Sequence, residues 1–195
     1  ELTTRAVSEP GDVSAITEQL GGKLLQVTDH GSKHDVTAVA DLLAGVLKQI
    51  EREQNAPGGI TGVDTGFPTL NRLTGGWQNG NLNVVGARPS VGKTTLALTV
   101  ALHAAKLGKV VYFVSAEMSA GELVRNMLCA EGGLRSSLIR TGGMTKAHWS
   151  KLDDAATALW ERKIYIDDSS GPSPQLIRRR ATRLALKHGR LDIVI

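Results

Sequence analysis

The feature that most constrains this chain is a glycine-framed loop at residues 82–95, LNVVGARPSVGKTT. It fits the pattern G-x-x-x-x-G-K-[ST]. The matching residues are Gly86, Gly92, Lys93 and Thr94. The apolar run at 82–85 predicts a buried strand before the loop, and residues 96–107 predict a helix after it. Strand, loop and helix in this order indicate a nucleoside triphosphate site. The alternative is a glycine-rich turn that contains Lys-Thr by chance.

The parts of this loop suit different tasks in phosphate binding. Its glycines permit a tight turn in which the N–H groups of residues 90–94 point at phosphate oxygens. Lys93 is expected to reach the β- and γ-phosphates as a point charge, and Thr94 to offer its hydroxyl to Mg²⁺. Thr95 adds a second hydroxyl for the phosphates. The predicted phosphate-binding residues are Gly86, Ser90, Val91, Gly92, Lys93, Thr94 and Thr95.

Composition bounds the class of protein. A chain of 195 residues, 41% of them apolar, fits one domain with an extra segment and can bury a core. No run approaches a membrane span and Glu1 begins no signal sequence, so we expect a cytoplasmic protein without a membrane partner. The single cysteine, Cys129, lies in an apolar stretch, which favours a core thiol over a redox or metal site.

The net charge of +4 is distributed unevenly. Residues 134–195 carry 12 basic and 6 acidic side chains, whereas residues 1–133 carry 11 and 13. Such a balance is compatible with nucleic acid without demonstrating it. The chain does not begin with Met, and residues 191–195 resemble a buried strand with no loop after it, so we expect a fragment of a longer protein.

The chain before the loop predicts two helices and a connector. Apolar residues spaced three or four apart at 13–27 predict a helix with one narrow apolar face. A second stripe predicts a helix from Thr37 to about Asn55. Residues 60–81 are expected to be an ordered connector on the edge of the domain. We therefore divide the chain into a tail with a helical linker, 1–36, and a nucleotide-binding domain, 37–195.

After the loop, predicted strands and helices alternate. The strands are expected at 110–115, 163–167 and 191–195, and the helices at 119–130, 145–160 and 173–188. This alternation predicts an α/β fold with a parallel sheet and helices on both of its faces.

Ligands of such sheets bind beyond the carboxyl ends of the strands, which draws attention to the acids there. Glu117 follows the strand at 110–115 and is a candidate base that activates water, although it also suits the start of the next helix. Asp167 and Asp168 fit turn chemistry better than a Mg²⁺ site. Asp192 stands at the wrong end of its strand to hold Mg²⁺.

The predicted helix at 173–188 is strongly basic. Its cations and the next one are Arg178, Arg179, Arg180, Arg183, Lys187 and Arg190. Because they point to several sides, the pattern favours solvated side chains, with contact to nucleic acid or another subunit as the alternative. His103 and His148 have no partner pattern and are interpreted as structural.

Four blocks of this sequence resemble the bacterial replicative helicases of the DnaB family. They are GGITGVDTGFPTLNRLTGGW (58–77), GARPSVGKTT (86–95), VSAEMSAGELVRNML (114–128) and IYIDDSSGPSPQLIRRRATRL (164–184). The resemblance covers residues 13–195 and implies a helical linker followed by the first part of a RecA-like motor domain that is truncated at its C-terminal end. Ala116, Asn83 and the pair Gly21-Gly22 depart from the family pattern.

The resemblance also implies roles for single residues. It makes Lys93 and Thr94 the ligands of the phosphates and Mg²⁺, and Glu117 the catalytic glutamate. Arg88, inside the loop, is a further candidate for nucleotide binding. Residues 13–27 match by position a helix that docks on the adjacent subunit of a ring.

For the parent protein, the resemblance implies a hexameric ring that hydrolyses ATP and translocates 5′ to 3′ on single-stranded DNA, with primase and a helicase loader as partners. The isolated 195 residues are expected to hydrolyse ATP very slowly. Two alternatives stay open: another RecA-like motor, such as a phage primase-helicase, and a nucleotide-binding interaction module that acts as a loader or regulator.

Overall fold

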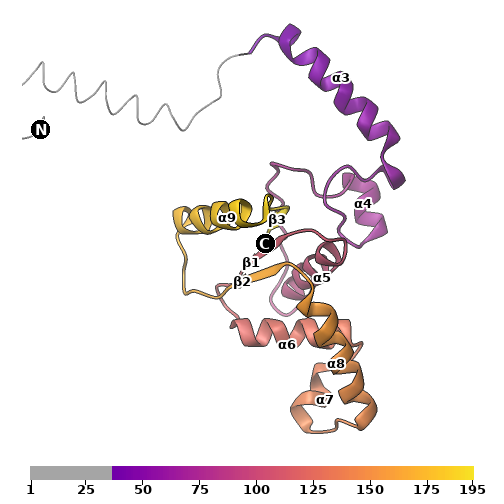
Figure 1. Cartoon of the computed structure of the whole chain (residues 1–195), viewed down its shortest axis with the longest axis vertical. Coiled ribbons are helices and arrows are strands. Elements are labelled where there is room, and N and C mark those ends of the chain that lie inside the picture. The colour runs from indigo at the N-terminus through magenta and orange to yellow at the C-terminus, as the bar shows by residue number, and fades with distance from the viewer. Residues whose placement is uncertain (1–36) are drawn as a thin grey trace, which may run out of the picture. The chain divides into compact units, whose positions relative to one another are not determined.

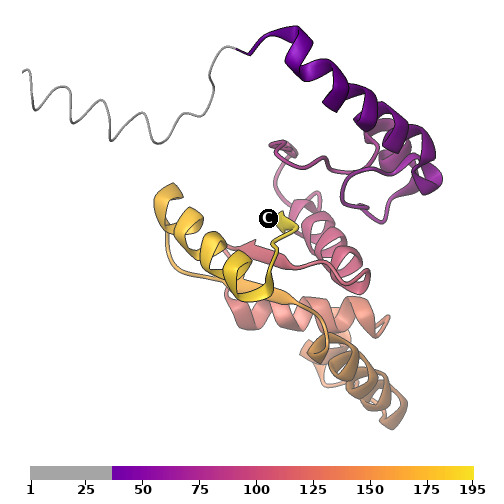
Figure 2. The same cartoon turned by 45° about the horizontal axis from the view of Figure 1, so that its top comes forward.

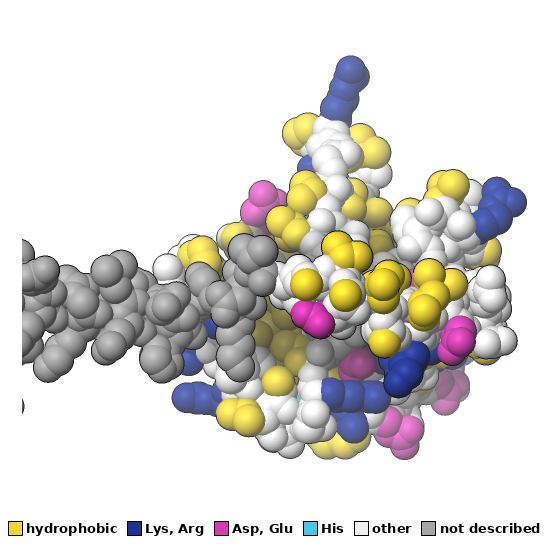
Figure 3. All heavy atoms as spheres, turned by 90° about the horizontal axis from the view of Figure 1, so that it is seen from above, with side chains coloured by type: hydrophobic (Ala, Val, Ile, Leu, Met, Phe, Trp, Pro, Cys, Tyr) yellow, Lys and Arg dark blue, Asp and Glu magenta, His cyan; other side chains and the backbone are white. Residues whose placement is uncertain are grey.

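The computed structural model describes residues 37–195, so the predicted helix at 13–27 lies outside the described residues. The chain divides into two units, Glu1–Ile50 and Glu51–Ile195. Helix α3, Val39–Asn55, begins in the first unit and has the predicted extent. None of its residues is buried, and Figure 3 shows hydrophobic side chains at the surface on the face seen from above. The apolar stripe of α3 is therefore exposed along its whole length.

The second unit opens with a connector that is pinned by buried polar groups. It contains a short 3-10 turn, η1 (Pro57–Gly59), and helix α4 (Pro68–Thr74), and Val63 pairs with Trp77 in an antiparallel bridge. Thr65 is fully buried and donates from its hydroxyl to Asn71 Oδ1 at 2.7 Å. Since Val63 belongs to the hydrophobic core, the connector is an integral part of the domain.

A parallel sheet of three strands forms the centre of this unit. Its order is β2 (Ile164–Asp167), β1 (Val111–Val114) and β3 (Ile193–Val194). The register pairs Tyr112 with Tyr165 and Val114 with Asp167. The predicted strands at 110–115, 163–167 and 191–195 are confirmed; β1 and β2 are slightly shorter than expected, and β3 is reduced to Ile193–Val194.

Helices cover both faces of the sheet because successive side chains of a strand point to opposite sides. Val111 and Phe113 face α5 (Lys93–Lys106) and α6 (Ala120–Glu131), whose apolar residues complete the core. Tyr112 faces the other way, towards α9 (Pro174–His188). Figures 1 and 2 show α9 and α6 on opposite sides of the strands.

Two further helices extend the α6 side. Helix α7 (Ser136–Thr141) follows α6 and is not among the predicted helices, and α8 (Lys146–Trp160) packs on α6. Arg162, just after α8, donates to both carboxylate oxygens of Glu131 at 2.7 and 2.5 Å. Between residues 37 and 195, none of the helices is both long and apolar enough to cross a lipid bilayer.

Start and stop signals predicted the helices well. Ser119 and Glu122 form a capping box at the start of α6, and α9 begins after Ser173 and ends before Gly189, in agreement with the helix predicted at 173–188. His148 completes a capping box with Thr145 at the start of α8, in agreement with a structural role.

The prediction of a strand at 82–85 is wrong. No strand forms there; Leu82 is 90% exposed and Val84 83% exposed. A strand requires a neighbour that accepts and donates its backbone hydrogen bonds. None of the three described strands lies beside this segment, so its apolar residues stay extended and unpaired.

Candidate active site

A cleft with a volume of about 960 Å³ opens at the carboxyl end of β1. One wall comes from the P-loop segment, residues 82–95, with Lys93 and Thr94. The opposite wall comes from the end of β1 and from the turn Ser115–Ser119, here called the glutamate turn because it carries Glu117. Residues 191–195 and the connector around Trp77 contribute the remaining apolar lining. The cleft therefore joins the two regions of sequence that were predicted to carry chemistry.

The P-loop segment presents free backbone donors to solvent. Helix α5 begins at Lys93, and its N-cap residue Gly92 has φ 105° and no side chain to cap the first turn. A residue with a side chain adopts such a φ only with strain, so glycine is required there. The uncapped N–H groups and the helix dipole make this terminus a site for an anion. Ser90, at φ 63°, turns the loop tightly just before it.

The lysine of the loop bends back over it. Lys93 Nζ donates to the carbonyl oxygen of Ala87 at 3.1 Å, which keeps the ammonium group above the loop. All residues from 86 to 95 are exposed, so a phosphate has free access to the backbone and to both threonine hydroxyls. These residues fit a nucleoside triphosphate with its Mg²⁺ in donor type, charge and exposure.

The glutamate turn is ordered by its own hydrogen bonds. The Ser115 hydroxyl donates to the carbonyl oxygen of Met118 at 2.7 Å and accepts from the Met118 N–H at 3.0 Å. Ser119 then caps α6. Glu117 itself is exposed and lines the cleft, beyond the end of β1.

The structure brings together three of the predicted site residues. Lys93, Thr94 and Glu117 all line the cleft. The other predicted residues form the exposed loop beside the cleft and are not part of its lining. They are Gly86, Arg88, Ser90, Val91, Gly92 and Thr95.

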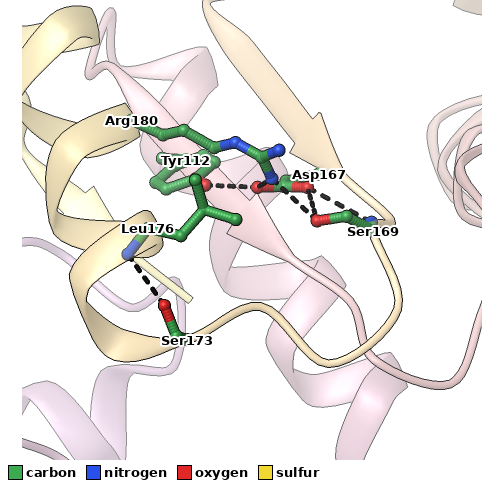
Figure 4. A network of polar contacts seen from close by, with 6 residues as sticks. All are labelled: Tyr112, Asp167, Ser169, Ser173, Leu176 and Arg180. Carbon is green, nitrogen blue, oxygen red and sulfur yellow. Dashed lines mark hydrogen bonds and ion pairs between the residues drawn. The ribbon is translucent and has the colours of Figure 1, made fainter.

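Asp167 forms a network that joins the sheet to α9 (Figure 4). It accepts hydrogen bonds from Tyr112 Oη at 2.5 Å, from Ser169 Oγ at 2.6 Å and from Arg180. Arg180 also donates to Ser169 Oγ at 2.7 Å. Burial raises the pKa of Asp167, but the donors around it outweigh burial, and the pKa is held well below its ordinary value. The carboxylate stays charged and fully engaged.

Asp168 and Asp192 are also engaged. Asp168 accepts a hydrogen bond from the Ala120 N–H, at the start of α6, at 2.8 Å. Asp192 accepts one from the Val110 N–H at 2.7 Å and pairs with Arg190 at 3.1 Å. Asp192 thus secures the beginning of β1, at the end of the strand away from the glutamate turn. Asp167 and Asp168 serve the polypeptide itself, as turn chemistry predicted.

Sequence reasoning missed Ser115 and the contact of Asp168. The available signal was the small polar residue at the end of a predicted strand together with the acids that follow the neighbouring strand. Because both strands end at the same edge of the sheet, these groups are adjacent in space although 53 residues apart in number.

The basic residues of α9 point in different directions. Arg180 points to the sheet, whereas Arg178, Arg179 and Arg183 line a shallow groove of about 500 Å³ on the outer side. Cys129 is free and buried, as predicted, and burial raises the pKa of its thiol.

Comparison with known proteins identifies the family. The model of the DnaB-like helicase C terminal domain matches residues 62–195. The chain is 38% identical to the replicative DNA helicase DnaB of Geobacillus stearothermophilus over 185 residues, which are 94% of this chain and 41% of that protein. It is 37% identical to the replicative DNA helicase DnaC of Bacillus subtilis (strain 168) over 179 residues, which are 91% of this chain and 39% of that protein.

Solved structures agree with this match. One solved ATPase domain superposes with a TM-score of 0.72 at 30% identity, covering 82% of this chain and 56% of that one. A DnaB-like replicative helicase, solved in a study of its interactions with primase, also gives a TM-score of 0.72, at 27% identity, over 99% of this chain and 45% of that one. These neighbours confirm the predicted RecA-like α/β fold.

The chain spans about two fifths of the length of the curated relatives that it matches. The chain belongs to the family of the DnaB-like helicase C terminal domain.

Proposed function

We propose that this chain forms the ATP-binding part of a replicative DNA helicase, and that its cleft is where ATP is hydrolysed. One observation carries the proposal: Lys93, Thr94 and Glu117, from two separate regions of sequence, line the same cleft. A phosphate-binding lysine, a metal-binding hydroxyl and a carboxylate are the groups that hydrolysis of a nucleoside triphosphate requires. The curated relatives are replicative DNA helicases.

The P-loop segment holds the triphosphate. Its backbone N–H groups and the positive end of the α5 dipole bind phosphate oxygens, and Lys93 exchanges its bond to Ala87 for the β- and γ-phosphates. Thr94 would hold Mg²⁺, which supplies charge neutralisation when it is bound. Thr95 and Arg88 add polar contacts at the edge of the loop. The remaining phosphate contacts come from Gly86, Ser90, Val91 and Gly92.

The glutamate turn supplies the base. Glu117 accepts a proton from the water that attacks the terminal phosphate, which makes the water oxygen a better nucleophile at the moment of attack. The carboxylate comes from the turn that follows β1, so the sheet anchors the backbone that carries it. The P-loop segment thus binds the nucleotide, and the glutamate turn carries the residue that activates the attacking water.

The parent protein works as a hexameric ring in the cytoplasm, moves 5′ to 3′ on single-stranded DNA, and meets primase and a helicase loader. The exposed apolar stripe of α3 supports assembly, because such a face needs another surface to cover it. The tail and linker predicted at residues 1–36 lie outside the described residues. The solved DnaB-like replicative helicase interacts with primase, which supports that partner. An interaction module without unwinding activity is not favoured by the helicase relatives.

The isolated 195 residues hydrolyse ATP very slowly. Residues 82–85, which lead into the P-loop, are exposed and pair with none of the described strands. A loop that is not anchored by a paired strand before it holds phosphate in many positions. The bound nucleotide must therefore order the loop.

The test is unwinding of a forked DNA by the full-length protein with ATP. Lys93→Ala should abolish unwinding and lower DNA-stimulated hydrolysis by about a hundredfold or more, because a charge that stabilises the transferred phosphate is lost. Lys151→Ala, an exposed lysine of α8, is the matched control and should retain wild-type activity. Normal unwinding by Lys93→Ala would overturn the proposal.

A further inference from the structure

We infer that Ser115 and Asp168 are positioning residues that hold the backbone of the glutamate turn and thereby fix the place of Glu117. The inference rests on the proposed function, since it concerns the residue that we propose as the base. Neither residue belongs to the P-loop pattern or to the predicted catalytic set. Both act on backbone groups within five residues of Glu117.

The need for such support follows from Glu117 itself. Its side chain is exposed, and among residues 37–195 nothing forms a hydrogen bond or ion pair with its carboxylate. Nothing along the side chain therefore fixes the carboxylate, and its position depends on the backbone that carries it. A displacement of about 1 Å at a reacting group can cost up to a hundredfold in rate.

Ser115 holds the turn from inside. It is 9% exposed, at the end of β1, and its hydroxyl bonds both the N–H and the carbonyl oxygen of Met118. The two hydrogen bonds close residues 115–118 into a ring that contains Glu117. Ser115 is in turn fixed to the sheet, because its N–H donates to the carbonyl oxygen of Asp167 at 2.8 Å.

Asp168 holds the turn from outside. Asp168 lies in the loop after β2, 48 residues further along the chain than Ala120. It accepts a hydrogen bond from the Ala120 N–H at 2.8 Å. This N–H belongs to the first turn of α6 and has no acceptor within the helix. A carboxylate there also interacts favourably with the positive end of the helix. The first residue of α6, directly after the glutamate turn, is thus tied to the loop that follows β2.

The network around Asp167 keeps Asp168 in place. Tyr112, Ser169 and Arg180 secure Asp167 on both of its carboxylate oxygens, one residue before Asp168 (Figure 4). The loop after β2 is therefore a firm base for the hydrogen bond to α6. The sheet, the loop after β2 and α6 together hold the backbone on both sides of Glu117.

The experiment measures kcat and KM for ATP in the full-length protein. Asp168→Ala should lower kcat about tenfold and leave KM within about twofold, because nucleotide binding depends on the P-loop segment and only the base is misplaced. Asp168→Asn keeps an oxygen acceptor for the Ala120 N–H and should recover most of the loss. Asp154→Ala, an exposed aspartate of α8, is the control and should match the wild type.

A second background separates positioning from general damage to the fold. Combined with Glu117→Gln, Asp168→Ala should lower the residual kcat by less than about twofold, because there is no base left to misplace. Ser115→Ala should behave in the same way. An unchanged kcat in Asp168→Ala, a rise in KM alone, or the same tenfold loss in the Glu117→Gln background would overturn the inference.

The outcomes also distinguish this inference from the proposed function. If Glu117→Gln is inactive while Asp168→Ala and Ser115→Ala are normal, only the positioning roles are refuted. If Glu117→Gln hydrolyses ATP at the wild-type rate, Glu117 is no base, and the proposed function itself fails at this residue.

Discussion

The P-loop segment and the glutamate turn line the same cleft, but neighbouring residues support them very differently. Residues 81–95 are all exposed, and within the loop Lys93 bonds the carbonyl oxygen of Ala87. The glutamate turn continues a buried strand, is closed by the hydrogen bond from the Ser115 hydroxyl to Met118, and leads into α6, whose Ala120 N–H donates to Asp168. The wall formed by the P-loop segment is therefore exposed, whereas the wall formed by the glutamate turn is ordered by hydrogen bonds within the protein.

The difference teaches how the two tasks of such a site are separated. Binding energy can be spent on ordering a loop around phosphate, since the ligand itself supplies the contacts. A base that acts in the transition state gains most from being fixed in advance. The contrast predicts where substitutions should damage the fold and where they should leave it intact.

Leu123→Ala should have the largest effect on the fold. Leu123 lies in α6 and is 0% exposed in the core behind the glutamate turn. Removing it should lower the free energy of unfolding by about 3 kcal/mol through lost burial and a cavity. Urea denaturation measures this loss, and Val124→Ala, at a half-exposed neighbour, is the control. Equal losses of unfolding free energy in Leu123→Ala and Val124→Ala would mean that the face of α6 that carries Leu123 is not packed in the core.

Nucleotide should stabilise the open wall selectively. ATP with Mg²⁺ at about a hundred times its Kd should raise the free energy of unfolding by about 2.7 kcal/mol. In amide hydrogen exchange, residues 86–95 should gain most of the protection, whereas residues 111–120 should change little because they are already ordered. Equal gains in both regions would contradict the contrast.

Asp167→Ala should cost about 2 kcal/mol of unfolding free energy, because it leaves Tyr112 and Arg180 without their charged acceptor. The pKa of Asp167 lies below its ordinary value of 3.8. Its stabilising effect is therefore fully present above that pH and is lost as the pH falls towards the folded-state pKa. The variant should show a weaker loss of stability below about pH 4. Asp153→Ala, an exposed aspartate of α8, should keep the wild-type pH dependence.

Leu82→Ser should have the smallest effect. Leu82 is 90% exposed in the P-loop segment, so the unfolding free energy of this 195-residue chain should change by less than about 0.5 kcal/mol. Leu98→Ser, at a core position of α5 that is 5% exposed, provides the contrast and should be strongly destabilising. A large loss in Leu82→Ser would show that the P-loop segment is packed after all.

The contrast between the P-loop segment and the glutamate turn also shows which features of the fold and the site could be predicted from the sequence. Helix α9 was predictable to the residue because Ser173-Pro174 and Gly189 act locally. Strands β1 and β2 were predictable because runs such as VVYFV are apolar on both faces of a covered sheet. The strand at 82–85 was wrongly predicted from the same kind of run, because pairing depends on a neighbour that the run does not encode. The site shows the same limit: Lys93 and Thr94 follow from a local pattern, whereas the contact of Asp168 with Ala120 depends on the fold.

The most direct test of the central claim is to measure ATP affinity and ATP turnover together in full-length Glu117→Gln. If the P-loop segment binds and the glutamate turn drives chemistry, the variant should keep its Kd for ATP within about twofold while turnover falls by about a hundredfold or more. Turnover near the wild-type rate, or a loss of affinity as large as the loss of turnover, would contradict the account.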